Sequence, residues 1–351
     1  MKAVIYTGYA YTGGIVPGLI LREFDSFIGP FPKNTEFRLF KERFALCELE
    51  DSLIETHDPE IVDLALKDFA WLFKKYARPD SFLSKTGFGL DKSTNNEFSK
   101  LTLSYIDSLT EFKYPMSWHF YDFRTKYFPL IFSRVIRRIL KTYKYGRQPA
   151  HFSFPNRNDF VEKTSAYVEG IMKAFIGESF YDDSNTIMFS KAVSPYSYKR
   201  ISQVVSYFDQ CKVLIVDRDP RDVYIELSRS GKDRYLFDSE DPMLIAKGFN
   251  KFFRSLRIEQ EAIRNHPNVL LINFEDICFR YETCLVKIYE FLAINPSLHS
   301  RKGEFFNPLE SQDNVGLWRS AKGKEREVIN FIESELQEFL YDELSTDVEL
   351  D

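Results

Sequence analysis

The sequence predicts a three-layer α/β fold, in which a parallel sheet carries helices on both faces and a large helical segment is inserted. Short apolar runs, each too short for a typical helix, recur at 186–189, 213–216 and 269–272. Segments with helical spacing fill the gaps between these runs. Three of the expected helices begin with Asp-Pro, an N-cap oxygen followed by proline, at Asp58, Asp219 and Asp241. This alternation is typical of parallel strands that are buried on both faces.

Composition limits the classes of protein to which the chain can belong. Its 351 residues suffice for one large domain, which we expect to span 1–351. The net charge of −5 argues against nonspecific binding of nucleic acid. Four cysteines without CxxC spacing favour neither a metal site nor disulfides and indicate a reducing compartment. Because no run of about 18 apolar residues occurs, we expect no membrane span and a cytoplasmic protein.

The first strand is expected at 3–6, and a glycine-rich loop, TGYAYTGGIVPG, follows at 7–18. Helical spacing resumes at Ile20, Leu21 and Phe24. A strand, a glycine loop and a helix in this order resemble a phosphate-binding loop, whose backbone N–H groups surround an anion. The Walker pattern itself is absent, because no Gly-Lys-Ser/Thr follows. A P-loop-like sheet is therefore one alternative at this point and a plain turn is the other, because glycines near a chain start are common in both.

A helical insertion is expected at 50–180, after an irregular loop at 25–57. Helices are predicted at 59–76, 96–110, 129–144 and 159–175, and the block shows almost no strand signal. A ring-rich stretch at 114–129 contains His119. We expect this insertion to cap the sheet on the side of an acceptor substrate.

The run 213–216 ends in Asp217-Arg218, and the helix that starts at Asp219-Pro220 follows at once. Arg218 therefore lies where a parallel strand opens onto the ligand-binding edge of the sheet. Its planar, always charged guanidinium suits an anion such as phosphate. The alternative is that Arg218 and Arg221 only pair with the neighbouring aspartates. Further helices are expected at 196–208, 220–229, 242–265, 278–293 and 324–340.

Several stretches together resemble one family, the sulfotransferases that use 3′-phosphoadenylyl sulfate (PAPS). They are GYAYTGG near the N-terminus, DRDPRDVY after the central strand, VLLINFEDI with a helix ending in EFL, and NVGLW in a late loop. They occur in the order that the family shows. The resemblance is greatest to bacterial-type members thought to act on carbohydrates or cell-surface glycans.

The resemblance implies roles for particular residues. The 5′-phosphosulfate would bind in the loop from Gly8 to Ile15, which contains Tyr9, Tyr11, Thr12, Gly13 and Gly14. Arg218 would bind the 3′-phosphate, with Ser228 as the available serine, and Phe274 would lie beside the adenine. The loop from Ser311 to Arg319, with Asn314, Gly316 and Trp318, would close over the 3′-phosphate. Lys191 matches a catalytic lysine near the transferred group.

The chain also departs from the family pattern. Tyr11 stands where the loop often carries lysine, and Val193 stands where a catalytic histidine is common. Glu226 takes the place of the usual serine eight residues after the arginine, and Ser228 lies two residues further on. Ser311-Gln312 aligns with the basic late loop of cytosolic members.

These features lead to three hypotheses. The first is a cytoplasmic enzyme that transfers a sulfuryl group from PAPS to a hydroxyl of a carbohydrate or glycolipid, with no metal and 3′,5′-bisphosphoadenosine as product. Because Val193 cannot accept a proton, His119 is our first choice of general base and Asp122 our second. The second hypothesis is a nucleotide-dependent kinase. The third is a non-catalytic descendant that binds a nucleotide or a partner.

Overall fold

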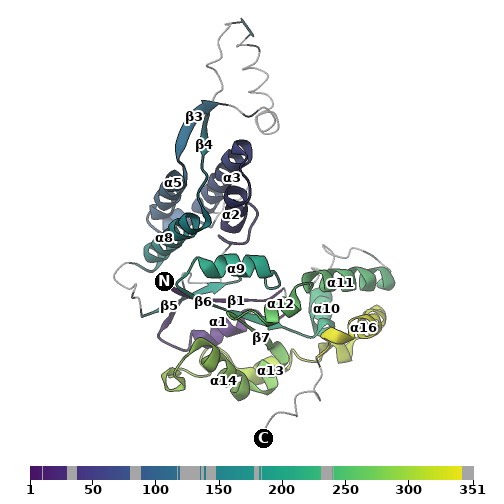
Figure 1. The fold of residues 1–351 in the computed structure, drawn as a ribbon. Coiled ribbons are helices and arrows are strands. Elements are labelled where there is room, and N and C mark those ends of the chain that lie inside the picture. The colour runs from purple at the N-terminus through teal and green to yellow at the C-terminus, as the bar shows by residue number, and fades with distance from the viewer. Residues whose placement is uncertain are drawn as a thin grey trace. The chain divides into compact units, whose positions relative to one another are not determined.

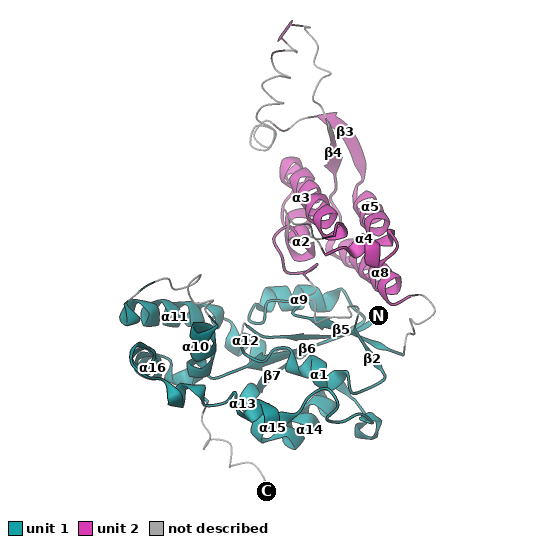
Figure 2. Cartoon of the chain, turned by 180° about the vertical axis from the view of Figure 1, so that it is seen from behind, with its two compact units in different colours: residues 1–37, 183–351 teal, residues 38–182 magenta. Residues whose placement is uncertain are grey.

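The computed structural model describes residues 1–9, 11–29, 38–79, 88–116, 118, 135, 138–139, 148–177, 182, 184–230, 239 and 241–341. The chain divides into two compact units, one formed by residues 1–37 and 183–351 and the other by residues 38–182 (Figure 2). The second unit is one continuous stretch between the two parts of the first. We call them the sheet unit and the helical unit.

The sheet unit contains five parallel strands in the order β2-β5-β1-β6-β7. They are β1 (Lys2–Thr7), β2 (Phe27–Ile28), β5 (Thr186–Ser190), β6 (Gln210–Asp217) and β7 (Val269–Asn273). In the middle of the sheet, Ile5 of β1 pairs with Phe189 on one side and Val213 on the other. All three side chains are fully buried, as the apolar runs predict.

Helices lie on both faces of this sheet, which confirms the predicted three-layer α/β class. α9 (Tyr198–Ser206) lies on one face, and α1 (Val16–Leu21) and α14 (Tyr281–Leu292) lie on the other (Figure 1). A separate apolar core, away from the sheet strands, joins α10 (Pro220–Arg229), α11 (Pro242–Leu256) and α16 (Lys324–Glu335). The remaining short elements are α12 (Gln260–Arg264), α13 (Phe274–Phe279), η2 (Pro296–Leu298), α15 (Pro308–Gln312), η3 (Leu317–Ser320) and η4 (Gln337–Phe339).

The three Asp-Pro pairs all begin helices, as predicted. The carboxylates of Asp58, Asp219 and Asp241 accept hydrogen bonds from backbone N–H groups in the first turns of their helices. Each of these helices also has proline at its first position, where the missing N–H costs nothing. Local sequence therefore determines where these helices start.

Helix ends were predicted less well, because tertiary contacts interrupt long helical patterns. The single helix expected at 242–265 is two helices, α11 and α12, which separate at Arg257. The Arg257 guanidinium reaches the carboxylate of Asp217 at the end of β6, and its backbone leaves the helical conformation there. The helix expected at 278–293 is likewise divided at Arg280 into α13 and α14.

The helical unit consists of helices around a core of aromatic rings. They are α2 (Leu46–Ile54), α3 (Pro59–Ala77), α4 (Leu90–Ser93), α5 (Glu97–Leu109) and α8 (Arg157–Ile176). Tyr105 and Tyr167 stack with their ring centroids 4.4 Å apart, and each hydroxyl bonds a threonine of the opposite helix. The expectation of almost no strand was wrong, because β3 (Phe112–Met116) and β4 (Gln148–Phe152) form an antiparallel pair. Proline and lysine in β3 obscure its strand pattern.

Among the described residues no helix is both long and apolar enough to cross a membrane. All four cysteines are buried free thiols. Within the described ranges no group of three His, Cys, Asp or Glu side chains is arranged to hold a metal ion. His119, Asp122 and most of the helix expected at 129–144 lie outside the described residues.

Candidate nucleotide site

The candidate site lies in the sheet unit, where β1, β6 and β7 end. Gly8 follows β1, Arg218 follows β6, and Phe274 follows β7. Because parallel strands end at one edge of a sheet, the segments that follow them are neighbours in space. The prediction that Gly8, Arg218 and Phe274 share one edge therefore agrees with the strand order.

The loop from Gly8 to Ile15 is packed so closely that several positions exclude a side chain. A Cβ atom on Gly8 would lie 2.8 Å from the Val216 carbonyl oxygen, and one on Gly14 would lie 2.7 Å from the Gly8 nitrogen. Gly13 has a φ of +77°, and its Cβ would lie 2.4 Å from the Phe274 ring. These contacts explain the glycines physically, because only glycine allows such close backbone approach.

Two other residues give the loop its shape. The Thr12 hydroxyl, which is buried, donates a hydrogen bond of 2.9 Å to the Tyr9 carbonyl. Tyr11 has a left-handed backbone with a φ of 65°, and its hydroxyl donates to Ser230 at the end of α10. The loop is thus held by a hydrogen bond within it and by a second one to the end of α10, the helix that follows Arg218.

Arg218 joins the segments that the sequence places in one site. Its Nη1 donates to the Tyr11 carbonyl oxygen at 2.7 Å, and its Nη2 donates to the carbonyl oxygen of Asn314. Its guanidinium carbon lies 5.0 Å from the centre of the Phe274 ring. Arg218 is only 4% exposed, and its Nε atom has no hydrogen-bond partner among the described residues. One guanidinium therefore touches the glycine loop, the residue after β7 and the late loop.

The acidic partner of Arg218 is Glu226, which sequence reasoning noted only as a departure. Glu226 Oε2 on α10 lies 3.1 Å from Arg218 Nη1. Arg221 pairs with a nearby aspartate, as the alternative predicts, because its Nη2 lies 2.6 Å from Asp219, whereas the ion pair of Arg218 is with Glu226. The available signal was the position of Glu226, on the helix that begins two residues after the arginine.

The late loop is attached to α10 by a buried carboxylate. Asp222 accepts hydrogen bonds from the N–H groups of Gly316, at 2.7 Å, and Trp318, at 3.1 Å. Burial raises the pKa of Asp222 although these two N–H groups oppose the shift. Gly316 has a φ of 78°, which favours glycine, and the Trp318 ring lies 3.8 Å from the Arg221 guanidinium.

The other predicted residues are placed as follows. Ser311 lies in the last turn of α15, and its carbonyl oxygen accepts the N–H of Asn314 at 3.1 Å. Ser228 is half-buried on α10, and among the described residues no hydrogen bond joins it to Arg218. Lys191 follows β5 with a φ of 49°, and its N–H donates to the Tyr6 carbonyl. Lys191 therefore lies at the same edge as the glycine loop, since β5 neighbours β1.

Val193 is the residue at which the resemblance to sulfotransferases led us to expect a histidine. Its backbone takes part in a contact that joins two segments of the sheet unit. Its side chain is buried, and its carbonyl oxygen accepts a hydrogen bond of 3.1 Å from the Thr7 hydroxyl at the end of β1. Nearby, the Tyr9 ring stacks on Tyr196 with centroids 5.5 Å apart. Burial raises the pKa of Tyr9, so its phenol stays protonated near neutral pH.

Sequence reasoning did not predict that Glu275, which lies directly after Phe274, is buried. Its Oε1 accepts the N–H of Asp219 at 2.8 Å, and its Oε2 has no hydrogen-bond partner within the described ranges. Burial raises the pKa of Glu275 to about 8, so the carboxyl is largely protonated at neutral pH. It lines a polar cavity of about 180 Å³ together with Arg218, Asn273 and Tyr341.

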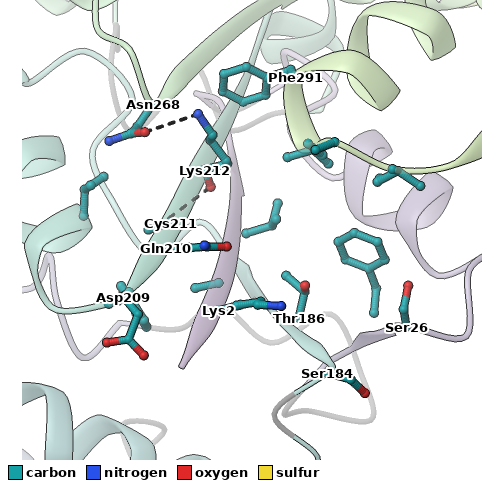
Figure 3. Close-up of a pocket in the computed structure, with 18 of the residues that line it drawn as sticks. Lys2, Ser26, Ser184, Thr186, Asp209, Gln210, Cys211, Lys212, Asn268 and Phe291 are labelled. Atoms are coloured by element: carbon teal, nitrogen blue, oxygen red, sulfur yellow. Dashed lines mark hydrogen bonds between the residues drawn. The ribbon is translucent and has the colours of Figure 1, made fainter.

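A larger cavity, of about 660 Å³, lies at the other edge of the sheet (Figure 3). Lys2, Thr186 and Gln210, which begin β1, β5 and β6, line it, so it faces the amino ends of the strands. Lys212 Nζ is held there by the Asn268 side chain at 3.3 Å. Because Arg218 and the glycine loop are at the carboxyl edge, the larger cavity is not part of the candidate site.

The helical unit contains a histidine–carboxylate pair that the sequence analysis did not find. Asp63 is fully buried and accepts hydrogen bonds from the N–H and Nδ1 of His151, Lys67 Nζ and Trp118 Nε1. Burial works to raise the pKa of Asp63, but the hydrogen bonds from His151 and Lys67 outweigh it and hold the pKa below its ordinary value. His151 thereby attaches β4 to α3.

No family model and no curated protein matches the chain. Among solved structures, it is similar to the sulfotransferase domain of the Synechococcus PCC 7002 olefin synthase, at 12% identity over 97% of this chain and 94% of that one, with a TM-score of 0.38. The sulfotransferase domain from the curacin biosynthetic pathway is 10% identical over 95% and 98%, with a TM-score of 0.40. A Mycobacterium avium sulfotransferase is 11% identical over 96% and 76%, also with a TM-score of 0.40. At such identities and TM-scores, the activity of this chain must be argued from its own residues.

Proposed function

We propose that this protein is a PAPS-dependent sulfotransferase that acts on a hydroxyl of a carbohydrate or glycolipid acceptor. The observation that carries the proposal is the position of Arg218, which touches Tyr11 of the glycine loop, Phe274 and Asn314. A nucleotide with phosphates at both the 5′ and 3′ positions needs two anion sites separated by a surface for adenosine. The glycine loop, the guanidinium and the Phe274 ring offer such a set at one edge of the sheet.

The residues present fit such a nucleotide. The closely packed glycine loop lies at the carboxyl edge of the sheet, and Arg218 carries a buried Nε–H without a partner in the described part of the chain. In PAPS, the bound nucleotide supplies an activated sulfuryl group whose S–O bond to the 5′-phosphate breaks as the acceptor oxygen bonds to sulfur. We assign the 5′ end to Gly8–Ile15, the 3′-phosphate to Arg218, and the adenine to Phe274.

The chain's own part in the reaction is to position groups and to offset charge. Lys191, beside the loop at the end of β5, is proposed to offset the negative charge that develops on the departing 5′-phosphate oxygen. His119 is proposed to accept the proton of the acceptor hydroxyl, an effect worth about 10²–10⁴-fold in rate. His119→Gln is therefore expected to lower turnover while leaving nucleotide affinity unchanged.

The acceptor class is proposed from the aromatic surface of the helical unit. Phe112 and Tyr114, on β3, are each more than half exposed. Flat exposed rings suit the apolar faces of sugars, which they cover by stacking. We propose that this unit supplies acceptor specificity, so that Tyr114→Ala raises the KM for a sugar acceptor without changing that for PAPS.

Thermal shift with 3′,5′-bisphosphoadenosine, ADP and 5′-AMP tests the nucleotide proposal. Ligand at 100 times its Kd adds about 2.7 kcal/mol of stability, so a specific nucleotide gives a clear rise in Tm. We expect the largest rise with the bisphosphate, followed by sulfuryl transfer from labelled PAPS to members of a sugar panel. A larger rise with ATP and Mg²⁺ would favour a kinase instead, and binding without transfer would favour a non-catalytic protein.

A further inference from the structure

Arg218 and Glu226 form an ion pair inside the candidate nucleotide site. Glu226 Oε2 lies 3.1 Å from Nη1, the atom that also donates to the Tyr11 carbonyl. The Arg218 side chain is 2% exposed, whereas that of Glu226 is 27% exposed. The arginine is thus fixed in the interior, and its counterion reaches the surface from α10.

The partners of Arg218 differ in how easily they can leave. The carbonyl oxygens of Tyr11 and Asn314 belong to the backbone of packed loops, and Phe274 is buried against the glycine loop. Glu226 is held by a flexible side chain with access to water. Of the groups that we find around this guanidinium, Glu226 is therefore the one that an incoming anion can displace.

We propose that Glu226 occupies the place of the 3′-phosphate on Arg218 and competes with it, so that Glu226 sets the selectivity of the site among nucleotides. This inference rests on the proposed function, because it takes Arg218 to be the 3′-phosphate site. A nucleotide that carries a 3′-phosphate must displace a carboxylate of like charge. A nucleotide with a free 3′-hydroxyl leaves the ion pair in place and can donate a hydrogen bond to it.

Two other acidic groups lie near the guanidinium. Asp222 faces it from α10 and Glu275 from the start of α13, and each has an electrostatic interaction with Arg218. Asp222 is already occupied by the N–H groups of the late loop, and Glu275 by that of Asp219. These two carboxyls hold the surrounding backbone. Glu226 is therefore the carboxyl whose replacement changes the charge around Arg218 without removing a backbone contact.

Calorimetric titration of the full chain with 3′,5′-bisphosphoadenosine and with 5′-AMP measures this competition. Glu226→Gln keeps the shape of the side chain and a carbonyl oxygen for Arg218, so the fold is expected to persist; Glu226→Ser is the second variant. We expect each to bind the bisphosphate about 10-fold more tightly than the native chain, which corresponds to about 1.4 kcal/mol. Affinity for 5′-AMP is expected to change by less than about 2-fold, since it places no charge on Arg218.

Glu325→Gln is the matched control. Glu325 on α16 lies 3.6 Å from Arg229 of α10, the helix that carries Glu226, and its replacement changes the net charge by the same amount. It is expected to leave both affinities unchanged. If Glu226→Gln binds the bisphosphate no more tightly than the native chain, the inference is wrong while the proposed function stands. If neither the native chain nor any variant prefers the bisphosphate to 5′-AMP, both are wrong.

Discussion

Two buried charges in the sheet unit, Glu23 and Arg218, are held in different ways. Glu23 is fully buried and accepts N–H groups from Gly303, Phe305 and Phe306, with His299 Nε2 at 2.5 Å from its second oxygen. All of these partners come from one stretch of chain. Arg218 instead takes partners from the glycine loop, the late loop and α10, and its Nε–H has no partner among the residues that the structure describes.

This difference distinguishes a structural charge from one suited to a ligand. Glu23 has both oxygens paired within the interior, so its charge is offset by the fold itself. Arg218 has a displaceable counterion and an unused donor, which leave it able to exchange a protein partner for a bound anion. Four substitutions test the contrast, in order of their expected effect on the free energy of unfolding.

Glu23→Ala is expected to have the largest effect. It leaves three backbone N–H groups and His299 without their acceptor in a buried place, and losing one partner of such a buried network costs about 3–5 kcal/mol. Urea unfolding measures the loss. Asp25→Ala is the control, because its ion pair with Arg301 is at the surface, where such pairs contribute less than about 1 kcal/mol. Equal unfolding midpoints for the two variants would contradict a structural role for Glu23.

Arg218→Ala is expected to be destabilising as well as unable to select the bisphosphate. The Tyr11 and Asn314 carbonyls lose charged donors, each worth about 1.5–3 kcal/mol. The Glu226 carboxylate can reach solvent when the arginine is removed. We therefore expect the free energy of unfolding to fall by about 3 kcal/mol in total, less than for Glu23→Ala. Urea unfolding measures the loss of stability, and titration with 3′,5′-bisphosphoadenosine measures the loss of selectivity. Arg229→Ala, which alters an exposed arginine of α10, is the control. A variant with native stability would show that Arg218 does not hold the two loops.

Asp222→Asn is expected to loosen the late loop. The amide retains one oxygen acceptor but presents an NH₂ group to the other backbone N–H, so one of two hydrogen bonds is lost at about 1–3 kcal/mol. Faster proteolytic cleavage near Gly316 and weaker bisphosphate binding are the expected observations. Unchanged cleavage would mean that other contacts hold the loop against α10.

Glu275→Gln is expected to change how stability depends on pH. The pKa of Glu275 is raised in the folded protein to about 8 by burial, so the folded state binds a proton that the unfolded state releases. The stability that this group contributes is full below its unfolded pKa and is lost as pH rises toward 8, by about 1.4 kcal/mol per pH unit at most. Urea midpoints between pH 5 and 8 should fall less steeply in the variant. Parallel curves would show that Glu275 is ionised throughout.

Much of the sheet unit was predictable because its signals are local. Apolar runs specify the buried strands, and Asp-Pro pairs specify three helix starts, since both depend on a few adjacent residues. The edge that unites Gly8, Arg218 and Phe274 follows from parallel strands alone. The helix end at Arg257 was not predictable, because a contact with Asp217 of a distant strand overrides helical spacing there.

The sequence by itself determined the class of fold, the position of the glycine loop and the presence of an arginine at a strand end, because each depends on neighbours in the chain. Tertiary structure alone decided which carboxylate pairs with that arginine, which acid becomes buried enough to keep its proton, and which carbonyls the guanidinium holds. Those outcomes depend on distances between segments up to 207 residues apart and on the burial of each group. Both quantities arise only when the sheet has formed.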